Sequence, residues 1–240
     1  MTRIALATCG AFPDGDPDDE LLLAALPEAE FAVWDDPAVD WDAFDLVVIR
    51  STWDYQDRID TFLAWVRSVP RLVNPREVIE WNTDKRYLGE LPGAVATAFL
   101  GPGEPFFAPA GEYVVKPSVS AGSRDTARFA AGEEERAASL VARIHATGRT
   151  AMVQPYVHAV DHEGEAALLF FDGVFSHAIR KASILQPGAD IGPGRRGAPR
   201  GNAGRRRRYH RLRDESIRFR RAQGPPVARC SGARGEFRVT

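Results

Sequence analysis

Short apolar runs alternate with amphipathic stretches over the first third of the chain. Residues 18–26 and 59–69 place apolar side chains at helical spacing, with acidic residues at the start of the first stretch. The intervening runs have the length of strands, and they cover residues 3–9, 29–35, 46–49 and 71–75. The run at 46–49 is apolar at every position and predicts a strand buried on both faces. Alternating strands and helices predict a parallel α/β sheet for residues 1–75.

The pattern continues differently from residue 76. We expect a helix over 76–91, in which Asn82 or Thr83 can cap a segment that places Lys85 near its start. The segments 112–117 and 125–130 predict a hairpin, and residues 133–148 predict an amphipathic helix.

Two further features complete the regular part of the chain. A strand is expected over 150–157, interrupted by Pro155, and two strands over 165–181 flank the turn signal Asp172-Gly173. After Lys181 the sequence shows neither helical nor strand periodicity.

Charge is distributed unevenly along the chain. Residues 191–240 contain 15 arginines and three acidic residues, a net charge of +12. The rest contains 16 of the 31 basic and 30 of the 33 acidic residues, a net charge of −14. A basic arm for nucleic acid, a disordered tail and an out-of-frame reading of a GC-rich gene each account for this segment. The missing lysine and nucleic-acid motif argue against the first account. We favour the third, because Arg, Gly, Pro and Ala dominate shifted frames of GC-rich genes and the change falls where the fold should continue.

Composition narrows the class of protein. The sequence contains no run of about 20 apolar residues, so we expect no transmembrane helix. The acidic N-terminus lacks the apolar core of a signal peptide. Two cysteines, Cys9 and Cys230, do not form a disulfide framework, and the five histidines lack metal-ligand spacing. These features predict a cytoplasmic protein.

Four features in a fixed order suggest a nucleotide site. They are Lys85; Lys116 with the pliable loop at 118–126; the segment 153–157; and Glu165. Lysines and small-residue loops suit phosphates, an interrupted strand offers backbone groups to a base, and an acid can accept from ribose hydroxyls. Taken singly, each feature is more often a solvated charge or an ordinary loop, whereas the ordered set favours function.

The same stretches resemble the ATP-grasp ligases. The resemblance is carried by "NTDKRYL", "YVVKPSVSAGSRDT" and "VQPYV…EGEAALLFFDGVFSHAIRK", the last of which is similar to glutathione synthetases. With "VWDDPAVDWDAFDLVVIRSTWDY" upstream, the chain most resembles the D-cycloserine-type cyclo-ligases. It implies a Rossmann-like N-terminal domain over 1–75, a small ATP-grasp subdomain over 76–153 and part of a large one over 154–190. Residues 191–240 then stand where a truncated or scrambled C-terminal part is expected.

The resemblance also implies an activity. Such ligases convert a small carboxylate into an acyl phosphate with ATP and Mg²⁺, and an amine-type nucleophile then displaces phosphate. A homo-oligomer is compatible with the family, and no membrane or nucleic-acid partner is expected. The alternative is a non-catalytic nucleotide- or nucleic-acid-binding protein that uses the arginine-rich tail.

The resemblance assigns roles to residues of this chain. Lys85 and Lys116 would hold the α- and β-phosphates, and the loop at 118–126 would cover the γ-phosphate. Arg180 would stabilise the transferring phosphoryl group, although a solvated strand-end cation is equally compatible. The loop residues Ser120, Gly122 and Ser123 would also bind ATP. Adenine would contact the hinge formed by Gln154, Pro155, Tyr156 and Val157, and the ribose hydroxyls would donate to Glu165.

The binding sites for the carboxylate and for Mg²⁺ are assigned less completely. Arg50, Ser51, Thr52 and Asp54 follow a predicted strand, where substrates bind in α/β folds, and could hold the carboxylate. The alternative is that Arg50 pairs with a nearby acid. Family members supply Mg²⁺ ligands from a late acidic strand, which this sequence lacks after Lys181, so no metal ligand is assigned. With the tail as written, we expect weak nucleotide binding and poor or absent ligase turnover.

Overall fold

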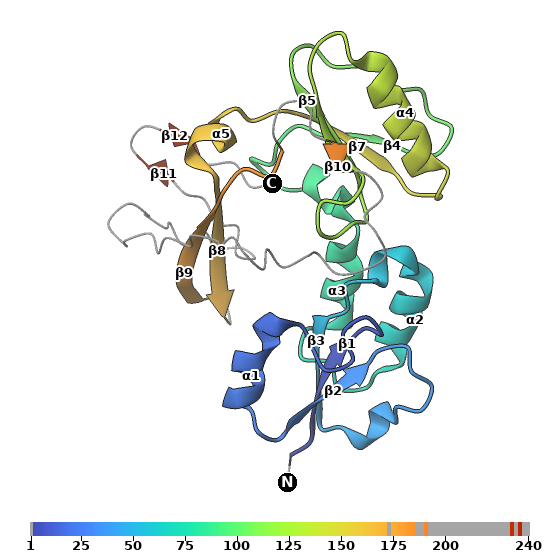
Figure 1. Cartoon of the computed structure of the whole chain (residues 1–240), viewed down its shortest axis with the longest axis vertical. Helices are drawn as coiled ribbons and strands as arrows, with labels where there is room; N and C mark the ends of the chain where they lie inside the picture. The colour runs from blue at the N-terminus through green and yellow to red at the C-terminus, as the bar shows by residue number, and fades with distance from the viewer. Residues whose placement is uncertain (1, 172–173, 186–189, 192–230, 233–234, 237–240) are drawn as a thin grey trace. The chain divides into compact units, whose positions relative to one another are not determined.

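The computed structural model describes residues 2–171, 174–185, 190–191, 231–232 and 235–236. Among these residues, two compact units are distinguished (Figure 1). The first contains the residues up to Tyr87 together with Ser118–Arg124, and the second contains residues 88–117 and the described residues from Asp125 onward. The expected arginine-rich tail at 191–240 lies almost wholly outside the described residues.

The first unit is built on a parallel sheet. Its strands are β1 (Ile4–Thr8), β2 (Ala29–Val33) and β3 (Leu46–Ser51), in the order β2-β1-β3. The helices α1 (Glu20–Ala25) and α2 (Ile59–Ser68) connect and follow them, with short 3-10 turns η1 (Pro17–Asp19), η2 (Trp41–Ala43) and η3 (Tyr55–Asp57). The predicted parallel α/β arrangement is therefore confirmed.

Successive side chains of β1 point to opposite faces of the sheet, so the core of this unit has two layers. Ala5 and Ala7 face a cluster that includes Phe62 and Trp65 from α2. Ile4 and Leu6 face a cluster completed by apolar residues of α1. Successive side chains of a strand point to opposite faces, so a strand with helices on both sides is apolar throughout.

Two details of this unit differ from the sequence-based expectation. Leu46 is partly exposed in β3, so the strand is not fully buried on both faces. The segment 71–75 forms only an isolated parallel bridge between Leu72 and Val47 instead of a strand. Pro70 precedes that segment and Pro75 ends it, and proline cannot donate a ladder hydrogen bond.

The expected helix over 76–91 is two elements. Helix α3 covers Arg76–Thr83, and the 3-10 helix η4 covers Lys85–Gly89. The Thr83 hydroxyl donates to the Ile79 carbonyl inside α3, so Thr83 does not cap a helix that begins near Lys85. The break leaves Lys85 at the start of its own short element.

The second unit contains an antiparallel sheet with one helix across it. Its elements are β4 (Ala98–Leu100), β5 (Tyr113–Pro117), β6 (Thr126–Phe129), β7 (Ala151–Pro155), β10 (Asp190–Ile191) and α4 (Glu134–His145). The strand order is β10-β6-β5-β7-β4, and β5 and β6 pair antiparallel as expected. Helix α4 lies against the strands β5 and β7 (Figure 1). Its apolar residues pack on Tyr113 and Val115 of β5 and on Phe129 of β6.

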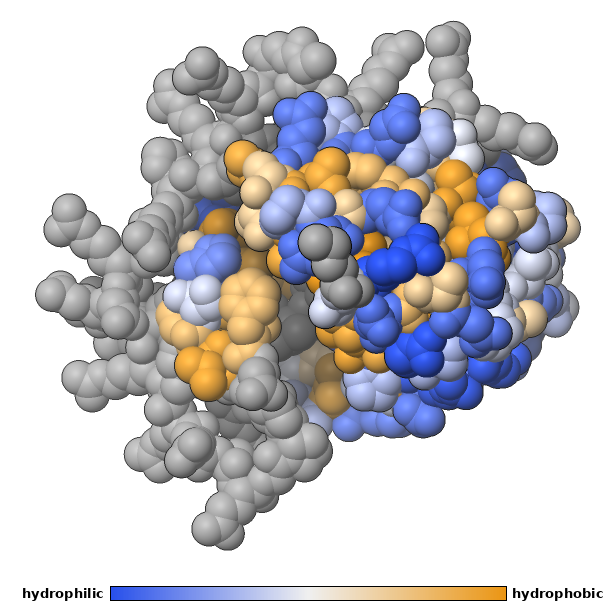
Figure 2. Space-filling view, turned by 90° about the horizontal axis from the view of Figure 1, so that it is seen from below, coloured by the Kyte–Doolittle hydropathy of each residue, from blue (hydrophilic) through white to orange (hydrophobic). Residues whose placement is uncertain are grey.

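A second hairpin belongs to the same unit. Strands β8 (Glu165–Phe171) and β9 (Val174–Lys181) pair antiparallel, and α5 (Ala159–Glu163) precedes them. The predicted strands are thus confirmed, while the turn Asp172-Gly173 lies outside the described residues. Figure 2 shows apolar residues gathered on this hairpin, at the left of the view. The remaining described elements are the short strands β11 (Ser231–Gly232) and β12 (Gly235–Glu236).

Candidate functional site

Lys116 occupies the end of β5, within the sheet of the second unit. Its neighbours in the strand, Val115 and Pro117, are buried, and Lys116 is itself only partly exposed. Burial lowers the pKa of Lys116, and the negative charge of Glu165 opposes that shift. A lysine held in this way carries a desolvated charge, which gives it a strong attraction for an incoming anion.

Lys85 lies in the first unit and contacts the loop at Ser118–Arg124. Its ammonium Nζ donates to the Ser120 carbonyl at 2.8 Å, to the Ser120 hydroxyl at 3.1 Å and to the Ser118 carbonyl at 3.3 Å. The Lys85 backbone N–H also donates to the Ser118 carbonyl at 3.0 Å. These hydrogen bonds hold Lys85 against the loop, while Lys116 is held within β5. Lys85 and Lys116 belong to different units, so their convergence on one triphosphate stays a prediction.

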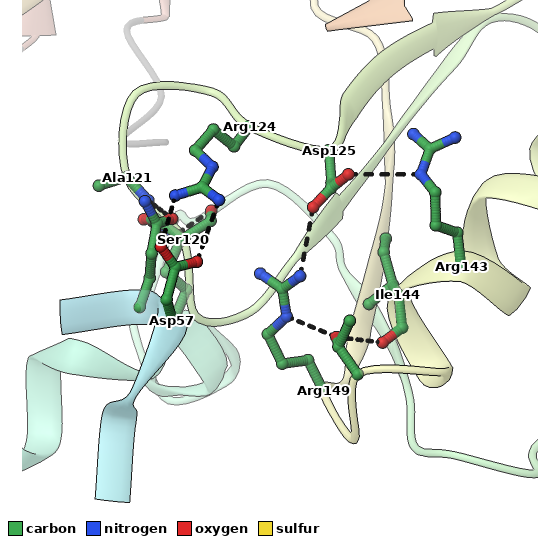
Figure 3. A network of polar contacts seen from close by, with 11 residues as sticks. Asp57, Ser120, Ala121, Arg124, Asp125, Arg143, Ile144 and Arg149 are labelled. Atoms are coloured by element: carbon green, nitrogen blue, oxygen red, sulfur yellow. Dashed lines mark hydrogen bonds and ion pairs between the residues drawn. The ribbon is translucent and has the colours of Figure 1, made fainter. Parts of the chain in front are cut away.

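The loop has an unusual backbone. Gly122, Ser123 and Asp125 all have positive φ, at 62°, 58° and 52°. Non-glycine residues in this region cost about 1 kcal/mol or more each, so neighbouring contacts must hold them there. Asp125, at the start of the second unit, is held by Arg149 at 3.2 Å and Arg143 at 3.3 Å (Figure 3).

The expected adenine hinge, residues 154–157, begins inside β7. Gln154 is buried, and its side-chain amide donates to the Thr97 hydroxyl at 2.7 Å. Pro155 was expected to leave backbone groups unpaired, but it is in register with Tyr113, and the Tyr156 N–H donates to the Glu112 carbonyl at 2.8 Å. The pairing continues because Tyr156, the next residue with an N–H, takes over the donor role. Val157 follows and is partly buried.

A buried arginine supports this hinge. Arg128 of β6 donates to Glu112 through Nε at 2.8 Å and to Asp161 of α5 through Nη1 at 3.0 Å. Its Cζ lies 3.5 Å from the centroid of the Tyr156 ring. The Tyr156 hydroxyl donates to the same Asp161 carboxylate. The charge of Arg128 is therefore matched by two carboxylates and covered by an aromatic face.

Glu165 and Arg180 both lie in the second hairpin. Glu165 opens β8 and pairs in register with Lys181, while Arg180 of β9 pairs with Ala166. Glu165 is close enough to influence the pKa of Lys116, so these two predicted nucleotide contacts share an electrostatic environment. The orientation of Arg180 toward a phosphate stays a prediction.

The proposed carboxylate segment ends β3 and is held by Asp19. Arg50 donates to Asp19 through Nε at 2.9 Å and through Nη2 at 2.5 Å, and the Ser51 hydroxyl donates to the other oxygen of Asp19. Burial raises the pKa of Asp19, but hydrogen bonds from Ser51 and Arg50 and the charge of Arg50 outweigh it, so the pKa is lowered. The alternative left open by the sequence, that Arg50 pairs with a nearby acid, is what the structure shows.

The rest of this segment is also engaged. Thr52 is buried, and its carbonyl accepts from the Tyr55 N–H at 3.1 Å. Asp54 accepts from the Trp34 indole at 2.8 Å and from Arg58 at 2.7 Å. These contacts fix the backbone after β3, where ligands bind in parallel α/β sheets.

Sequence reasoning missed three residues of these environments: Asp19, Gln56 and Arg128. Asp19 was interpreted only as one of the acids that open a helix. Arg128 offered a signal, since it is a charged residue between the buried Ala127 and Phe129 of a short strand. Gln56, whose side-chain Oε1 accepts from the loop residue Ala121 N–H at 2.6 Å, had no distinctive neighbour in sequence, because this contact joins residues 65 positions apart.

No metal-binding group is apparent in the described part of the chain. Among those residues, no three His, Cys, Asp or Glu side chains cluster so as to hold an ion. Their helices also include none with the length and hydropathy that crossing a bilayer requires.

Comparison with known proteins identifies relatives of this chain. Residues 4–74 match the family described as D-cycloserine synthetase DcsG, N-terminal domain. The cycloserine biosynthesis protein DcsG of Streptomyces lavendulae is 39% identical over 180 residues, which cover 68% of this chain and 60% of that protein. The chain therefore spans about three fifths of the length of this curated relative.

Solved structures give a consistent result. The crystal structure of D-cycloserine synthetase DcsG matches with a TM-score of 0.71 at 36% identity, covering 79% of this chain and 71% of that one. D-alanine–D-alanine ligase from Bacillus anthracis, complexed with ATP, matches with a TM-score of 0.52 at 13% identity, covering 75% and 67% of the two chains. At that identity the second match shows a shared fold.

Proposed function

Because this chain belongs to the ATP-grasp ligase family, we propose that it is an ATP-dependent ligase acting on a small carboxylate. The observation that carries the proposal is the partly buried Lys116 at the end of β5, whose pKa burial lowers and the charge of Glu165 raises. An ammonium group with a lowered pKa is costly for a structural residue and useful for binding phosphate. The relatives that make cycloserine or join D-alanine suggest an amino-acid carboxylate.

The proposed reaction has two steps. A carboxylate oxygen attacks the γ-phosphorus of ATP, the bond to the β-phosphate oxygen breaks, and ADP leaves. An amine nitrogen then attacks the acyl carbon, a C–N bond forms, phosphate leaves with the acyl oxygen, and the amine loses a proton. If the nucleophile belongs to the same molecule, the second step closes a ring.

This chain's residues would act mainly by binding and positioning. Lys85 and Lys116 would contact phosphates, the loop at 118–126 would exclude water, and Arg180 would stabilise charge on the transferring group. Gln154, Pro155, Tyr156 and Val157 would contact adenine, and Glu165 the ribose. Arg50, held in place by Asp19, would contact the carboxylate substrate from the segment that also contains Ser51, Thr52 and Asp54. Mg²⁺ would be required with ATP, but the described residues show no cluster that fits it, so no step is assigned to it.

Replacing Lys116 with methionine tests the proposal. We expect Mg-ATP to raise the melting temperature of the wild type, and Lys116→Met to weaken nucleotide binding by about tenfold or more, because a charge-assisted contact is lost. Arg136→Met, at an exposed position of α4, is the control and should bind as the wild type does. The absence of a shift in the wild type would contradict the proposal.

The same variant gives a pH signature without nucleotide. Because the pKa of Lys116 is lowered on folding, the unfolded chain binds its proton more tightly. Lys116→Met should therefore be more stable than the wild type below the folded pKa. This advantage should shrink as pH rises toward about 10.4, the ordinary lysine value. Urea unfolding at several pH values measures it, and a constant difference would contradict the assignment.

The arginine-rich segment supports a second candidate function, binding of nucleic acid. Its +12 charge is the specific observation in favour. Nucleic-acid binding that falls steeply with salt and is abolished by deleting residues 191–240 would support it. Phosphate release that needs both ATP and a carboxylate would support the ligase.

A further inference from the structure

The loop at Ser118–Arg124 is attached to the 3-10 turn η3 by three consecutive residues. The Tyr55 hydroxyl donates to the Ser120 carbonyl at 3.4 Å, and Gln56 accepts from the Ala121 N–H at 2.6 Å. Asp57 pairs with Arg124 at 3.0 Å (Figure 3). All of these residues belong to the first unit. The turn η3 follows directly on the proposed carboxylate segment at 50–54.

Gln56 makes the most specific of these contacts. It is almost fully buried, and both ends of its amide are used: Oε1 accepts from Ala121 N–H, and Nε2 donates to the Trp53 carbonyl at 3.3 Å. A backbone N–H can only donate and a backbone carbonyl can only accept, so the two partners fix the orientation of the amide. Gln56 therefore ties the loop to the peptide unit at Trp53.

This contact involves a group that the proposed function would need elsewhere. In a phosphate-binding loop the backbone N–H groups face the phosphate oxygens. The Ala121 N–H cannot donate fully to Gln56 and to a phosphate at the same time. The Lys85 ammonium is likewise bonded to the Ser120 carbonyl and hydroxyl of the same loop. These contacts within the chain thus occupy donors for which a bound nucleotide would compete.

We propose that Gln56 is a positioning residue that holds the loop against η3 by occupying the Ala121 N–H. Nucleotide binding exchanges this hydrogen bond for one to phosphate, which releases Gln56 from the loop while its contact with Trp53 persists. The inference rests on the proposed function for its second half. The attachment of the loop to Gln56 can be tested without any nucleotide.

Hydrogen exchange in the nucleotide-free chain tests the attachment. Gln56→Leu removes both contacts at similar volume, and we expect the Ala121 amide to exchange about tenfold faster. Gln56→Glu keeps an acceptor for Ala121, so the exchange at this amide should stay near the wild-type rate or slow further. Unchanged exchange in Gln56→Leu, with a folded protein by circular dichroism, would overturn the proposal.

Affinity for Mg-AMP-PNP tests the competition. Gln56→Leu should bind about fivefold more tightly than the wild type, because one hydrogen bond no longer holds the loop. Gln56→Glu should bind more weakly, because its carboxylate both retains Ala121 and repels phosphate. A purely structural role would weaken binding in both variants and would overturn the proposal. If the wild type does not bind Mg-AMP-PNP, the proposed function fails, while the exchange result still decides the attachment of the loop.

Discussion

Asp19 shows how one buried carboxylate organises the end of a strand. Its side chain is 1% exposed, and it accepts from Arg50, Ser51 and the Asp16 N–H. A buried carboxylate is tolerated only when its oxygens are paired, and here both oxygens receive donors. The position of Arg50 is thus set by Asp19 before any substrate arrives.

Asp19→Asn should destabilise the first unit by about 3 kcal/mol, because it leaves Arg50 without its charge partner and replaces an acceptor by a donor. Urea unfolding at pH 7 measures the change. Glu30→Gln is the matched control, since it breaks the exposed pair with Arg3 and should cost less than about 1 kcal/mol. Equal effects of the two substitutions would contradict the role of Asp19.

The lowered pKa of Asp19 adds a pH dependence. The stabilisation is fully present above the unfolded aspartate pKa of about 3.9, and it is lost as pH falls through the lower folded value. The stability difference between the wild type and Asp19→Asn should therefore shrink below about pH 4. A difference that stays constant down to the lowest pH at which both fold would argue against the shift.

Some residue roles could be derived from the sequence and others could not. Lys116 was recognisable because a lysine ends an apolar strand and precedes a small-residue loop. Gln56 was not, because a hydrogen bond across 65 residues leaves no local pattern. The pairing of Arg50 with an acid could be anticipated, but the choice of Asp19 depended on how η1 folds onto β3.

At the level of elements, periodicity predicted most strands and helices. It worked for α4 because that helix has apolar residues at regular spacing, and for β1 because both of its faces are covered. It failed for the segment 71–75, where two prolines limit pairing to one bridge. Helix α5 was missed, because a five-residue helix has too few positions to show a period.

Helix α5 is expected to depend on Arg128. A helix of this length is unstable alone, and Asp161 links it to Arg128 in β6. Arg128→Lys keeps the charge but cannot reach two carboxylates and cover the Tyr156 ring together. We expect a loss of about 2–4 kcal/mol in stability and faster proteolysis within residues 156–164. Limited proteolysis with mass spectrometry checks this.

Arg136→Lys is the control for this experiment. Arg136 forms an exposed pair with Glu133 on α4, so its replacement should leave the proteolysis rate unchanged. If Arg128→Lys behaves as this control does, the contacts of Arg128 do not determine the order of α5.

At the scale of the whole molecule, the fold class was accessible from sequence and the arrangement of the site was not. A parallel sheet followed by antiparallel hairpins follows from local patterns and agrees with the ATP-grasp relatives. The predicted nucleotide contacts, however, are distributed over two units, with Lys85 in one and Lys116 in the other. Local patterns place each lysine at the end or start of an element, but they carry no information on distances between units.

The hairpin of β8 and β9 leads to a final prediction, because it exposes large apolar side chains. Phe171 is 65% exposed and Val174 69% exposed, at the ends of the two strands next to their turn. Contiguous apolar surface promotes association, and a two-stranded hairpin alone is marginally stable.

Replacing Phe171 with serine and Val174 with threonine should therefore lower both binding of the dye ANS and the rate of aggregation. Leu21→Ser, at a position of α1 that is 83% exposed, is the comparison and should change neither, because it removes apolar surface outside the hairpin. Undiminished dye binding in the double variant would show that the hairpin is not the surface responsible.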